Sequence, residues 1–406
     1  MKMRDSFDPG VRAPEVGARV DSNGVTYCVW APTQKSLSVA VGDTDPAERE
    51  IPLESNHDGY WVGTDKAGRA GDLYRFRFSD GRLRPDSASR YQPQGVHGPS
   101  ACIDPTAFQW RCSSWVRPEW RGQSIYEIHL GTFTPAGTYF AAIEKLNHIQ
   151  DLGVEAIELM PLADFAGNRN WGYDGVSLFA PARCYGHPDD LRALVDAAHE
   201  RGLAVILDLV YNHLGPAGNY LADFSPAYFR SDQYTPWGAA FNLDGSLSQP
   251  VREFILGNAT YWLKEFRFDG LRLDATHAIP DQSSPHLLEE IAAAVHALGG
   301  FVIAEDERNE SRLLDSSERG GLGLDALWAD DFHHQVRVAL THTRASYFRA
   351  YRGTAADIAD VLTHGWTYRG QSYEPWKGRT RGSASEHLPP ASFVFCIENH
   401  DQVGNR

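Results

Sequence analysis

Residues 270–277 read GLRLDATH, a short apolar run that passes directly into charged and polar side chains. Three other segments share this design: LDLVYNH at 207–213, VIAEDER at 302–308 and FCIENHD at 395–401. Each combines a strand-forming run with carboxylates that have Arg or His nearby. The C-terminal ends of parallel strands meet at one edge of a sheet, so four such segments predict one shared site.

The same succession of strand, loop and helix extends over the chain after residue 124. In Pro188–Arg201 apolar residues recur on one helical face, and Gly202 ends the helix. Repeated βα units predict a parallel sheet, and polar strand ends favour a (β/α)8 TIM barrel. A doubly wound sheet is the alternative, although no GxGxxG follows the first strand. The seven predicted strands are Ser124–Leu130, Ala156–Leu162, Ala204–Val210, Gly270–Asp274, Phe301–Glu305, Ala326–Ala329 and Phe393–Ile397.

The sequence after the seventh predicted strand holds no candidate for an eighth, since the chain ends at Arg406. We therefore expect a TIM barrel that lacks its eighth strand. An open sheet of this kind leaves two unpaired edges. The sequence is accordingly interpreted as a fragment of a longer protein.

The first hundred residues show short apolar runs and turns but no helical period. LYRFRF at 73–78 alternates aromatic and Arg side chains, as a half-buried strand does. We expect a small immunoglobulin-like β-sandwich, followed by an ordered connection over residues 85–100. The predicted domains are a carbohydrate-binding-like sandwich at 1–105 and a catalytic, C-terminally incomplete (β/α)8 barrel at 106–406.

The amino-acid composition limits the classes of binding partner and the cell compartment that we expect for this chain. Of 406 residues, 53 are Asp or Glu and 38 are Lys or Arg, giving a formal net charge of −15 that disfavours nucleic acid. No run of 18 apolar residues occurs, so we expect no membrane partner. The five Cys residues are odd in number and lack CxxC spacing, which predicts a cytoplasmic protein without a disulfide framework. The composition carries no signal for an oligomeric state.

Three carboxylates among the polar strand ends, Asp274, Glu305 and Asp401, suit glycoside cleavage. In that reaction one carboxyl protonates the leaving oxygen while another attacks the anomeric carbon. Arg272 shares a strand face with Asp274 and would hold it ionised as a nucleophile. Glu305 would be the acid, with its pKa raised by neighbouring carboxylates. Asp401, with His400, would contact sugar hydroxyls and stabilise positive charge.

Two other hydrolase chemistries fit the sequence less well. A metal hydrolase would use paired His residues at the strand ends, but the first strand offers only His129. His333 and His334 follow the sixth strand, yet adjacent side chains point to opposite faces. A Ser-His-Asp hydrolase would need a GxSxG turn, which is absent. We expect no metal and no other cofactor.

Aromatic loops provide candidate sugar platforms. Tyr173, within NWGYDG at 170–175, follows the second strand and is expected to stack under a sugar ring. Trp366, Tyr368, Tyr373 and Trp376 lie before the seventh strand in a long loop that is predicted to line further sugar subsites.

These motifs resemble the four signature regions of the α-amylase family of glycoside hydrolases. The matching positions are Asp208-x₄-His213, Gly270-x-Arg272-x-Asp274, Glu305 and Asn399-His400-Asp401. The resemblance implies a retaining mechanism with Asp274 as nucleophile, Glu305 as acid/base and Asp401 as transition-state stabiliser. The substrate-binding residues that we expect are Tyr173, Asp208, His213, Arg272, His277 and His400.

Within this family, three segments resemble members that act on maltooligosyltrehalose: PDSASRYQPQGVHGP at 85–99, AEDERN at 304–309 and NHDQVGNR at 399–406. The resemblance implies hydrolysis of the α-1,4 bond next to the terminal trehalose, with maltooligosyltrehalose or a related α-glucan as substrate. Residues 274–277 read DATH, whereas many α-amylases carry a Lys-His pair there. This departure favours a leaving group unlike that of starch.

Two other hypotheses remain. A glucan branching or debranching enzyme of the same family also pairs an N-terminal sandwich with a barrel. A truncated chain that binds glucan without turnover is the second alternative. Formation of α-1,6 linkages would favour the first, and binding without turnover the second.

Overall fold

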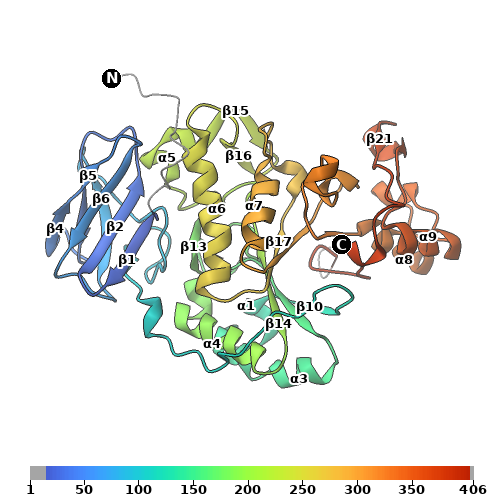
Figure 1. Ribbon diagram of the computed structural model, residues 1–406, viewed down its shortest axis with the longest axis horizontal. Helices are drawn as coiled ribbons and strands as arrows, with labels where there is room; N and C mark the ends of the chain where they lie inside the picture. The colour runs from blue at the N-terminus through green and yellow to red at the C-terminus, as the bar shows by residue number, and fades with distance from the viewer. Residues whose placement is uncertain (1–14, 403–406) are drawn as a thin grey trace.

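The computed structural model describes residues 15–402, in which an N-terminal β-sandwich packs against a parallel half-barrel (Figure 1). The sandwich lies at one end of the molecule, and a segment carrying helices α8 (Asp330–Thr341) and α9 (Ala355–His364) lies at the other. The parts of the sequence predictions that concern residues 1–14 and 403–406 lie outside the described residues.

The sandwich consists of two antiparallel sheets, which confirms that prediction. Its strand β7 alternates as the sequence pattern indicated, with Tyr74, Phe76 and Phe78 buried. One sheet has the order β1 (Gly17–Asp21), β2 (Gly24–Trp30), β6 (Tyr60–Asp65), β5 (Glu54–Ser55). The other has the order β4 (Arg49–Pro52), β3 (Leu37–Val41), β7 (Leu73–Phe78), β8 (Leu83–Arg84), with β9 (Ser100–Ala101) paired to β7.

The barrel sheet contains seven strands, and every neighbouring pair is parallel. Its order is β10 (Ile125–Ile128), β11 (Ala156–Leu159), β14 (Ala204–Leu209), β17 (Gly270–Leu273), β18 (Phe301–Ala304), β19 (Ala326–Trp328) and β22 (Phe393–Val394). These are the seven predicted strands, each somewhat shorter than expected. Over residues 15–402 the sheet is an incomplete TIM barrel, with one unpaired edge on β10 and one on β22.

Helices separate the strands and cover the outer face of the sheet (Figure 1). Helix α4 (Pro188–His199) confirms the predicted amphipathic helix and begins with a capping box: the Asp189 backbone N–H donates to His187 Nδ1, and the His187 backbone N–H donates to Asp190. The other helices are α1 (Leu130–Phe133), α2 (Tyr139–Ile143), α3 (Leu146–Asp151), α5 (Leu221–Phe224), α6 (Ser248–Glu265) and α7 (Leu287–His296).

Short elements complete the architecture. Three two-stranded pairs occur: β12 (Ala163–Asp164) with β13 (Ser177–Pro181), β15 (Phe229–Thr235) with β16 (Gly238–Phe241), and β20 (Gln371–Ser372) with β21 (Thr380–Arg381). The 3₁₀ turns are η1 (Pro105–Ala107), η2 (Arg183–Tyr185), η3 (Pro226–Tyr228), η4 (Thr276–Ala278), η5 (Ser311–Leu313), η6 (Ser317–Arg319), η7 (Ser346–Ala350), η8 (Glu374–Trp376) and η9 (Pro390–Ser392).

The segment between β19 and β22 is folded, whereas the sequence pattern predicted a long loop. It contains α8, α9 and the β20–β21 hairpin. Trp366 does not line a sugar subsite: it is fully buried, and its ring meets that of Phe393 edge-on at 5.3 Å. Tyr368 likewise packs inside the segment, where its hydroxyl donates to the Ala350 carbonyl at 2.6 Å. The prediction is therefore wrong for these two aromatics.

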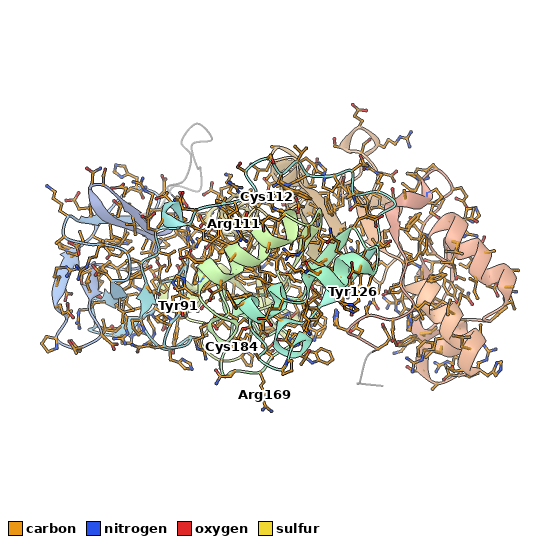
Figure 2. The ribbon with its side chains drawn as sticks, turned by 90° about the horizontal axis from the view of Figure 1, so that it is seen from below. Tyr91, Arg111, Cys112, Tyr126, Arg169 and Cys184 are labelled. Atoms are coloured by element: carbon orange, nitrogen blue, oxygen red, sulfur yellow. The ribbon has the colours of Figure 1, made fainter. Side chains whose placement is uncertain are left out.

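The connection from the sandwich to the barrel is held against the outer helices. Arg111 and Cys112 are labelled in Figure 2. Their backbone N–H groups both donate to Asp196 of α4, at 3.0 and 2.9 Å. On the barrel side, the Phe224 ring of α5 packs against Phe76 and Phe78 of the sandwich at 5.7 and 5.1 Å. Among the described residues, no helix is both long and apolar enough to cross a membrane.

The inside of the half-barrel changes character along the strands. Apolar side chains fill the end where the strands begin: Ala156, Ala204, Ile206, Phe301, Ile303 and Ala326, with Trp328 above them. Further along, the inward positions carry Glu127, Glu158, Asp208 and Arg272. Charge thus replaces apolar packing where the strands end, as expected for the functional face of a barrel.

Candidate active site

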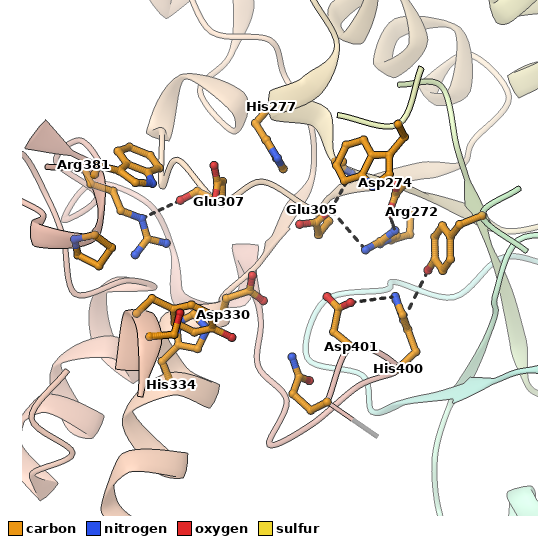
Figure 3. Close-up of a pocket in the computed structure, with 18 of the residues that line it drawn as sticks. Arg272, Asp274, His277, Glu305, Glu307, Asp330, His334, Arg381, His400 and Asp401 are labelled. Carbon is orange, nitrogen blue, oxygen red and sulfur yellow. Dashed lines mark hydrogen bonds and ion pairs between the residues drawn. The ribbon is translucent and has the colours of Figure 1, made fainter. Parts of the chain in front are cut away.

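A cleft of about 770 Å³ lies at the C-terminal ends of the barrel strands (Figure 3). Eight of the nine predicted site residues line it: Tyr173, His213, Arg272, Asp274, His277, Glu305, His400 and Asp401. Asp208, the ninth, lies buried beneath them. The four strand-end segments therefore meet, as their shared design predicted.

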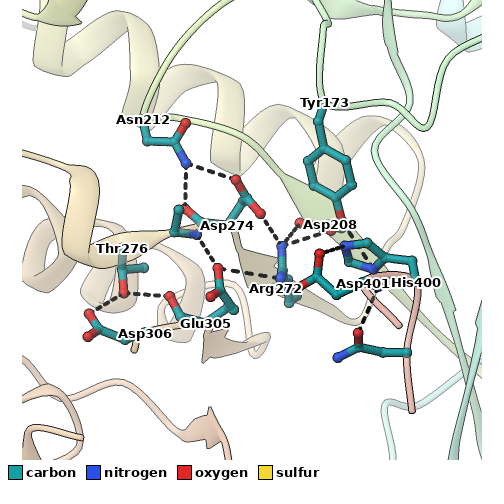
Figure 4. Close-up of polar contacts among 12 residues, drawn as sticks. Tyr173, Asp208, Asn212, Arg272, Asp274, Thr276, Glu305, Asp306, His400 and Asp401 are labelled. Atoms are coloured by element: carbon teal, nitrogen blue, oxygen red, sulfur yellow. Dashed lines mark hydrogen bonds and ion pairs between the residues drawn. The ribbon is translucent and has the colours of Figure 1, made fainter. Parts of the chain in front are cut away.

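Arg272 is the buried centre of the site (Figure 4). Its Nη1 donates to both oxygens of Asp208 at 2.9 Å and to Asp274 Oδ1 at 2.7 Å. Its Nη2 lies 3.6 Å from Glu305 Oε2. The guanidinium also lies 4.2 Å from the centre of the Trp328 ring. One cation thus contacts carboxylates from three neighbouring strands.

Asp274 is held through both of its carboxylate oxygens. Arg272 donates to Oδ1, and the Asn212 side-chain amide donates to Oδ2 at 2.8 Å. These two donors fix the orientation of the Asp274 carboxylate in the cleft. The same-face placement of Arg272 and Asp274 is confirmed.

Glu305 is tied to the turn that follows Asp274. Ala275 adopts the left-handed conformation, with φ of 42°, and its backbone N–H donates to Glu305 Oε2 at 2.6 Å. The backbone N–H of Thr276 donates to the Glu305 carbonyl at 2.9 Å. Burial is the main cause that raises the pKa of Glu305; Asp274 raises it further and Arg272 opposes the change. The prediction named neighbouring carboxylates as the cause, so burial is a correction to it.

Asp208 and Tyr173 form the floor beside Arg272. Burial raises the pKa of Asp208 to about 6, although Arg272 acts in the opposite direction. The Tyr173 hydroxyl donates to Asp208 Oδ2 at 2.6 Å. The Tyr173 ring stacks on His400, with ring centres 5.0 Å apart and planes inclined by 30°. The Tyr173 ring thus lines the cleft beside His400.

His400 and Asp401 reach the cleft from the loop after β22. His400 Nε2 lies 3.9 Å from Asp401 Oδ1, and the Asp401 side chain is 58% exposed. The Glu127 carboxylate accepts from His400 Nδ1 at 2.7 Å and from its backbone N–H at 2.9 Å. Burial is the largest single influence on the pKa of His400 and lowers it, but the hydrogen bond and the charge of Glu127, together with the charge of Asp208, outweigh burial and raise that pKa.

Two further His residues line the cleft. The His213 ring stacks on Trp237, the tip of the β15–β16 hairpin, at 5.3 Å between ring centres. Burial lowers the pKa of His213, which favours the neutral ring. His277 lies on η4, and its Nδ1 has no hydrogen-bond partner within the described part of the chain.

Several residues in or beside the cleft escaped prediction. Glu127 and Trp237 lie away from the four strand-end segments. Asp330 and Asp331 follow β19 directly and repeat the design of an apolar strand with a polar end, a signal that would have found them. The segment between β19 and β22 contributes one wall of the cleft: Asp330, His334, Ser346, Tyr347, Arg349, Tyr373, Pro375, Trp376 and Arg381. The predicted lining roles of Tyr373 and Trp376 agree with this wall.

The wall formed by that segment is held by a buried ion pair. Arg381 Nη1 donates to Asp331 Oδ1 at 2.9 Å and to the Tyr351 hydroxyl at 2.6 Å. Arg381 Nε donates to the Glu307 carbonyl at 2.7 Å. Despite its burial, Asp331 has a pKa well below its ordinary value, because Arg381 and hydrogen-bonding neighbours stabilise its charge. In residues 15–402 no group of three or more His, Cys, Asp and Glu residues is arranged to hold a metal ion.

Comparison with protein families matches both parts of the chain. The family model described as "Carbohydrate-binding module 48 (Isoamylase N-terminal domain)" covers residues 15–93. The model described as "Alpha amylase, catalytic domain" covers residues 75–238.

Individual relatives match over nearly the whole chain. Malto-oligosyltrehalose trehalohydrolase from Saccharolobus solfataricus is 44% identical over 96% of this chain and 68% of its own length. The enzyme of the same name from Deinococcus radiodurans is 43% identical over 94% of this chain and 62% of its own length. A crystal structure of an alpha amylase candidate from Salmonella typhimurium is 40% identical, with a TM-score of 0.90 over 97% of this chain and 67% of that one.

The chain thus spans about two thirds of the length of these relatives, between 62% and 68%. The matched part makes up 94–97% of this chain. From this identity over nearly its full length, the chain belongs to the malto-oligosyltrehalose trehalohydrolases of the α-amylase family of glycoside hydrolases.

Proposed function

We propose that this chain is a retaining glycoside hydrolase that cleaves the α-1,4 bond next to the terminal trehalose of maltooligosyltrehalose. The observation that carries the proposal is the arrangement of Asp274 and Glu305 on neighbouring strands around the guanidinium of Arg272. One of these carboxylates is paired with a cation, while burial raises the pKa of the other. Carboxyl groups in such different environments can divide the roles of nucleophile and acid between them.

The reaction proceeds in two steps. Asp274 attacks the anomeric carbon, the bond to the trehalose oxygen breaks, and the proton of Glu305 passes to that oxygen. Trehalose leaves, and a glycosyl ester on Asp274 remains. Glu305, now ionised, takes a proton from water as the water oxygen attacks the anomeric carbon and the ester bond breaks. The maltooligosaccharide is released with its configuration retained, and both carboxyl groups return to their starting states.

The other predicted residues bind and stabilise the sugar. Asp401, supported by His400, lies across the cleft from Glu305 and stabilises the positive charge of the transition state. Tyr173 stacks beneath the sugar ring, while Arg272 and the buried Asp208 fix the charges below it. His213 and His277 contact sugar hydroxyls from the opposite wall. An acidic cleft rich in aromatic rings suits a neutral α-glucan that becomes cationic during cleavage.

The domain division and compartment complete the proposal. We place the boundary between Pro105 and Thr106, because the last sandwich strand ends at Ala101 and the first barrel strand begins at Ile125. All five Cys residues are free, which supports a reducing compartment and hence the cytoplasm.

The test is incubation of the purified chain with maltotriosyltrehalose, with maltopentaose as the comparison substrate, and quantification of free trehalose. We expect trehalose release from the first and little cleavage of the second. Glu305→Gln should lower the rate by about 10²- to 10⁴-fold, and Asp274→Asn by at least as much. Glu318→Gln, an exposed carboxylate on η6, is the control and should leave the rate unchanged. Full activity in either cleft variant would refute the assigned roles.

A further inference from the structure

Glu127 is a charged group that the proposed reaction does not use. It lies on β10, the first strand of the barrel, with its carboxylate directed toward the loop after β22. Both of its oxygens accept hydrogen bonds from one residue, His400: Oε1 from the ring Nδ1 at 2.7 Å and Oε2 from the backbone N–H at 2.9 Å. A double contact of this kind fixes both the ring and the backbone of its partner.

The Glu127–His400 contact is important because β10 is an edge strand of the barrel sheet. On one side β10 pairs with β11, where Glu127 is in register with Glu158. On its other side no strand of residues 15–402 is paired with it. The Glu127–His400 contact therefore links the first strand of the sheet to the loop that follows the last strand, and this loop carries Asp401.

We propose that Glu127 is a positioning residue, which orients the His400 ring so that Nδ1 faces β10 and Nε2 faces Asp401 and the sugar. A carboxylate can only accept, so Nδ1 must carry the hydrogen in this contact. When the ring is doubly protonated, Nε2 is a second donor. Nε2 lies 3.9 Å from Asp401 Oδ1, an ion-pair distance, and its one hydrogen can be donated to a sugar hydroxyl. The activity part of this inference rests on the proposed function.

The charges around His400 support the doubly protonated ring. The titratable groups that face it are Glu127 from β10, Asp208 from β14, Arg272 from β17, Tyr173 from the loop between β12 and β13, and Asp401 from its own loop. Burial and Arg272 lower the pKa of His400, whereas Glu127 and Asp208 raise it, and the pKa rises overall. Glu127 makes the shortest contact and the largest favourable contribution.

The first measurement needs no substrate. The pKa of His400 is determined by NMR titration of ring-labelled protein, with its signal assigned through His400→Gln. We expect Glu127→Gln to lower the pKa of His400, because it removes the charge and keeps the side-chain length. Glu155→Gln is the matched control: Glu155 precedes β11 and accepts from the Ser124 backbone at 2.7 Å, away from the cleft. It should leave the titration unchanged.

The second measurement is the pH profile of kcat/KM for trehalose release. We expect Glu127→Gln to reduce kcat/KM by about 10- to 100-fold, as for other carboxylates that orient a His ligand. The alkaline limb should move to lower pH, because the ring then loses its proton earlier. Glu127→Asp keeps the charge, so its limb should stay near that of the wild type even if the rate falls.

Either measurement can overturn the proposal. An unchanged pKa of His400 in a folded Glu127→Gln protein would do so, whether or not the chain releases trehalose. If Glu127→Gln does not fold, Glu127→Asp decides the question. A displaced His400 titration in Glu127→Asp, together with a fall in the free energy of unfolding that equals the fall in kcat/KM expressed as a free energy, would leave Glu127 a purely structural role. Failure of trehalose release in the wild type, with the expected NMR shift, would instead count against the proposed function.

Discussion

At the scale of the residue, the site is an excess of negative charge around one buried cation. Arg272 contacts Asp208, Asp274 and Glu305, while Asp401 stands across the cleft. A neutral sugar gains little from this field in its ground state. The positively charged sugar of the transition state gains much more, because the carboxylates are already oriented before charge develops.

We expect Glu305→Gln to be more resistant to heat than the wild type at about pH 8, and we expect this advantage to be smaller at about pH 5. Burial raises the pKa of Glu305 above its ordinary value of 4.5, so the unfolded chain ionises this carboxyl at a lower pH than the folded chain does. The wild type therefore loses stability as the pH rises from the ordinary pKa of this carboxyl toward its raised pKa in the folded chain. The Glu305→Gln variant, which is uncharged at this position, has no such loss. Thermal unfolding midpoints at both pH values test this. An equal difference at the two values would contradict it.

The proximity of site residues was predictable where the residues follow apolar strands of the same parallel sheet. Asp274 and Glu305 directly follow apolar strands, and His400 and Asp401 lie in the loop after another, so their proximity followed from the parallel sheet. Glu127 was not predictable in this way, because it sits inside a strand and meets a partner 273 positions away. The raised pKa of Glu305 was also foreseen in direction, but burial, its main cause, is a property of the folded cleft.

At the scale of the element, the β15–β16 hairpin brings Trp237 over the cleft. This side chain is 53% exposed, although its ring stacks on His213. An exposed aromatic ring beside a polar cleft is a ready platform for sugar.

Trp237→Ala should raise KM for maltotriosyltrehalose by about 2- to 10-fold, the equivalent of one aromatic stacking contact. The value of kcat should change less, because Trp237 touches none of the reacting carboxylates. Tyr234→Ala is the control on the same hairpin: Tyr234 is 75% exposed and does not line the cleft. Steady-state kinetics of the two variants test this prediction. Equal KM values for Trp237→Ala and Tyr234→Ala would contradict a role of Trp237 in sugar binding.

The segment between β19 and β22 depends on an ion pair that almost no water reaches. The side chains of Arg381 and Asp331 are 3% and 0% exposed. Removing one partner leaves the other charge buried without compensation.

Arg381→Met is therefore expected to destabilise the protein by about 3–5 kcal/mol. Arg349→Met, which breaks the exposed pair with Glu374, should leave stability unchanged. Chemical denaturation of both variants measures the difference. Similar free energies of unfolding for the two would show that the buried pair does not hold this wall.

The elements themselves were predictable to different degrees. All seven barrel strands and α4 followed from apolar periodicity. The segment with α8 and α9 did not, because its order depends on contacts between distant positions, such as Arg381 with Asp331 and Trp366 with Phe393. Periodicity reports burial along one element, and it carries no information about which distant element covers it.

At the scale of the whole molecule, the sandwich and the barrel share an apolar contact surrounded by ion pairs. The Phe224 ring packs against Phe76 and Phe78, and the nearby Asp223 accepts from Arg82 and Arg84. The rings are buried, while the charged groups are partly exposed. Burial of aromatic area outweighs partly exposed ion pairs in free energy.

Phe224→Ala should destabilise the protein by about 3–5 kcal/mol. It should also separate the unfolding of the sandwich from that of the barrel, which would appear as two transitions in calorimetry. Asp223→Asn should cost only about 0–1 kcal/mol and keep a single transition. A single transition with little loss of stability in Phe224→Ala would mean that the two parts are joined mainly elsewhere.

The left-handed turn at Ala275 has a mechanical consequence. Ala275 follows Asp274, the proposed nucleophile, and its backbone N–H donates to Glu305, the proposed acid on the adjacent strand. The spacing of these two carboxyl groups is therefore set by a few covalent bonds and one short hydrogen bond. When the sheet flexes, the Asp274 and Glu305 carboxyl groups move together, so distortion elsewhere in the barrel changes the distance between them little. In the proposed retaining reaction, the distance between the two carboxyl groups thus depends on a linkage a few atoms long rather than on the rigidity of the entire barrel.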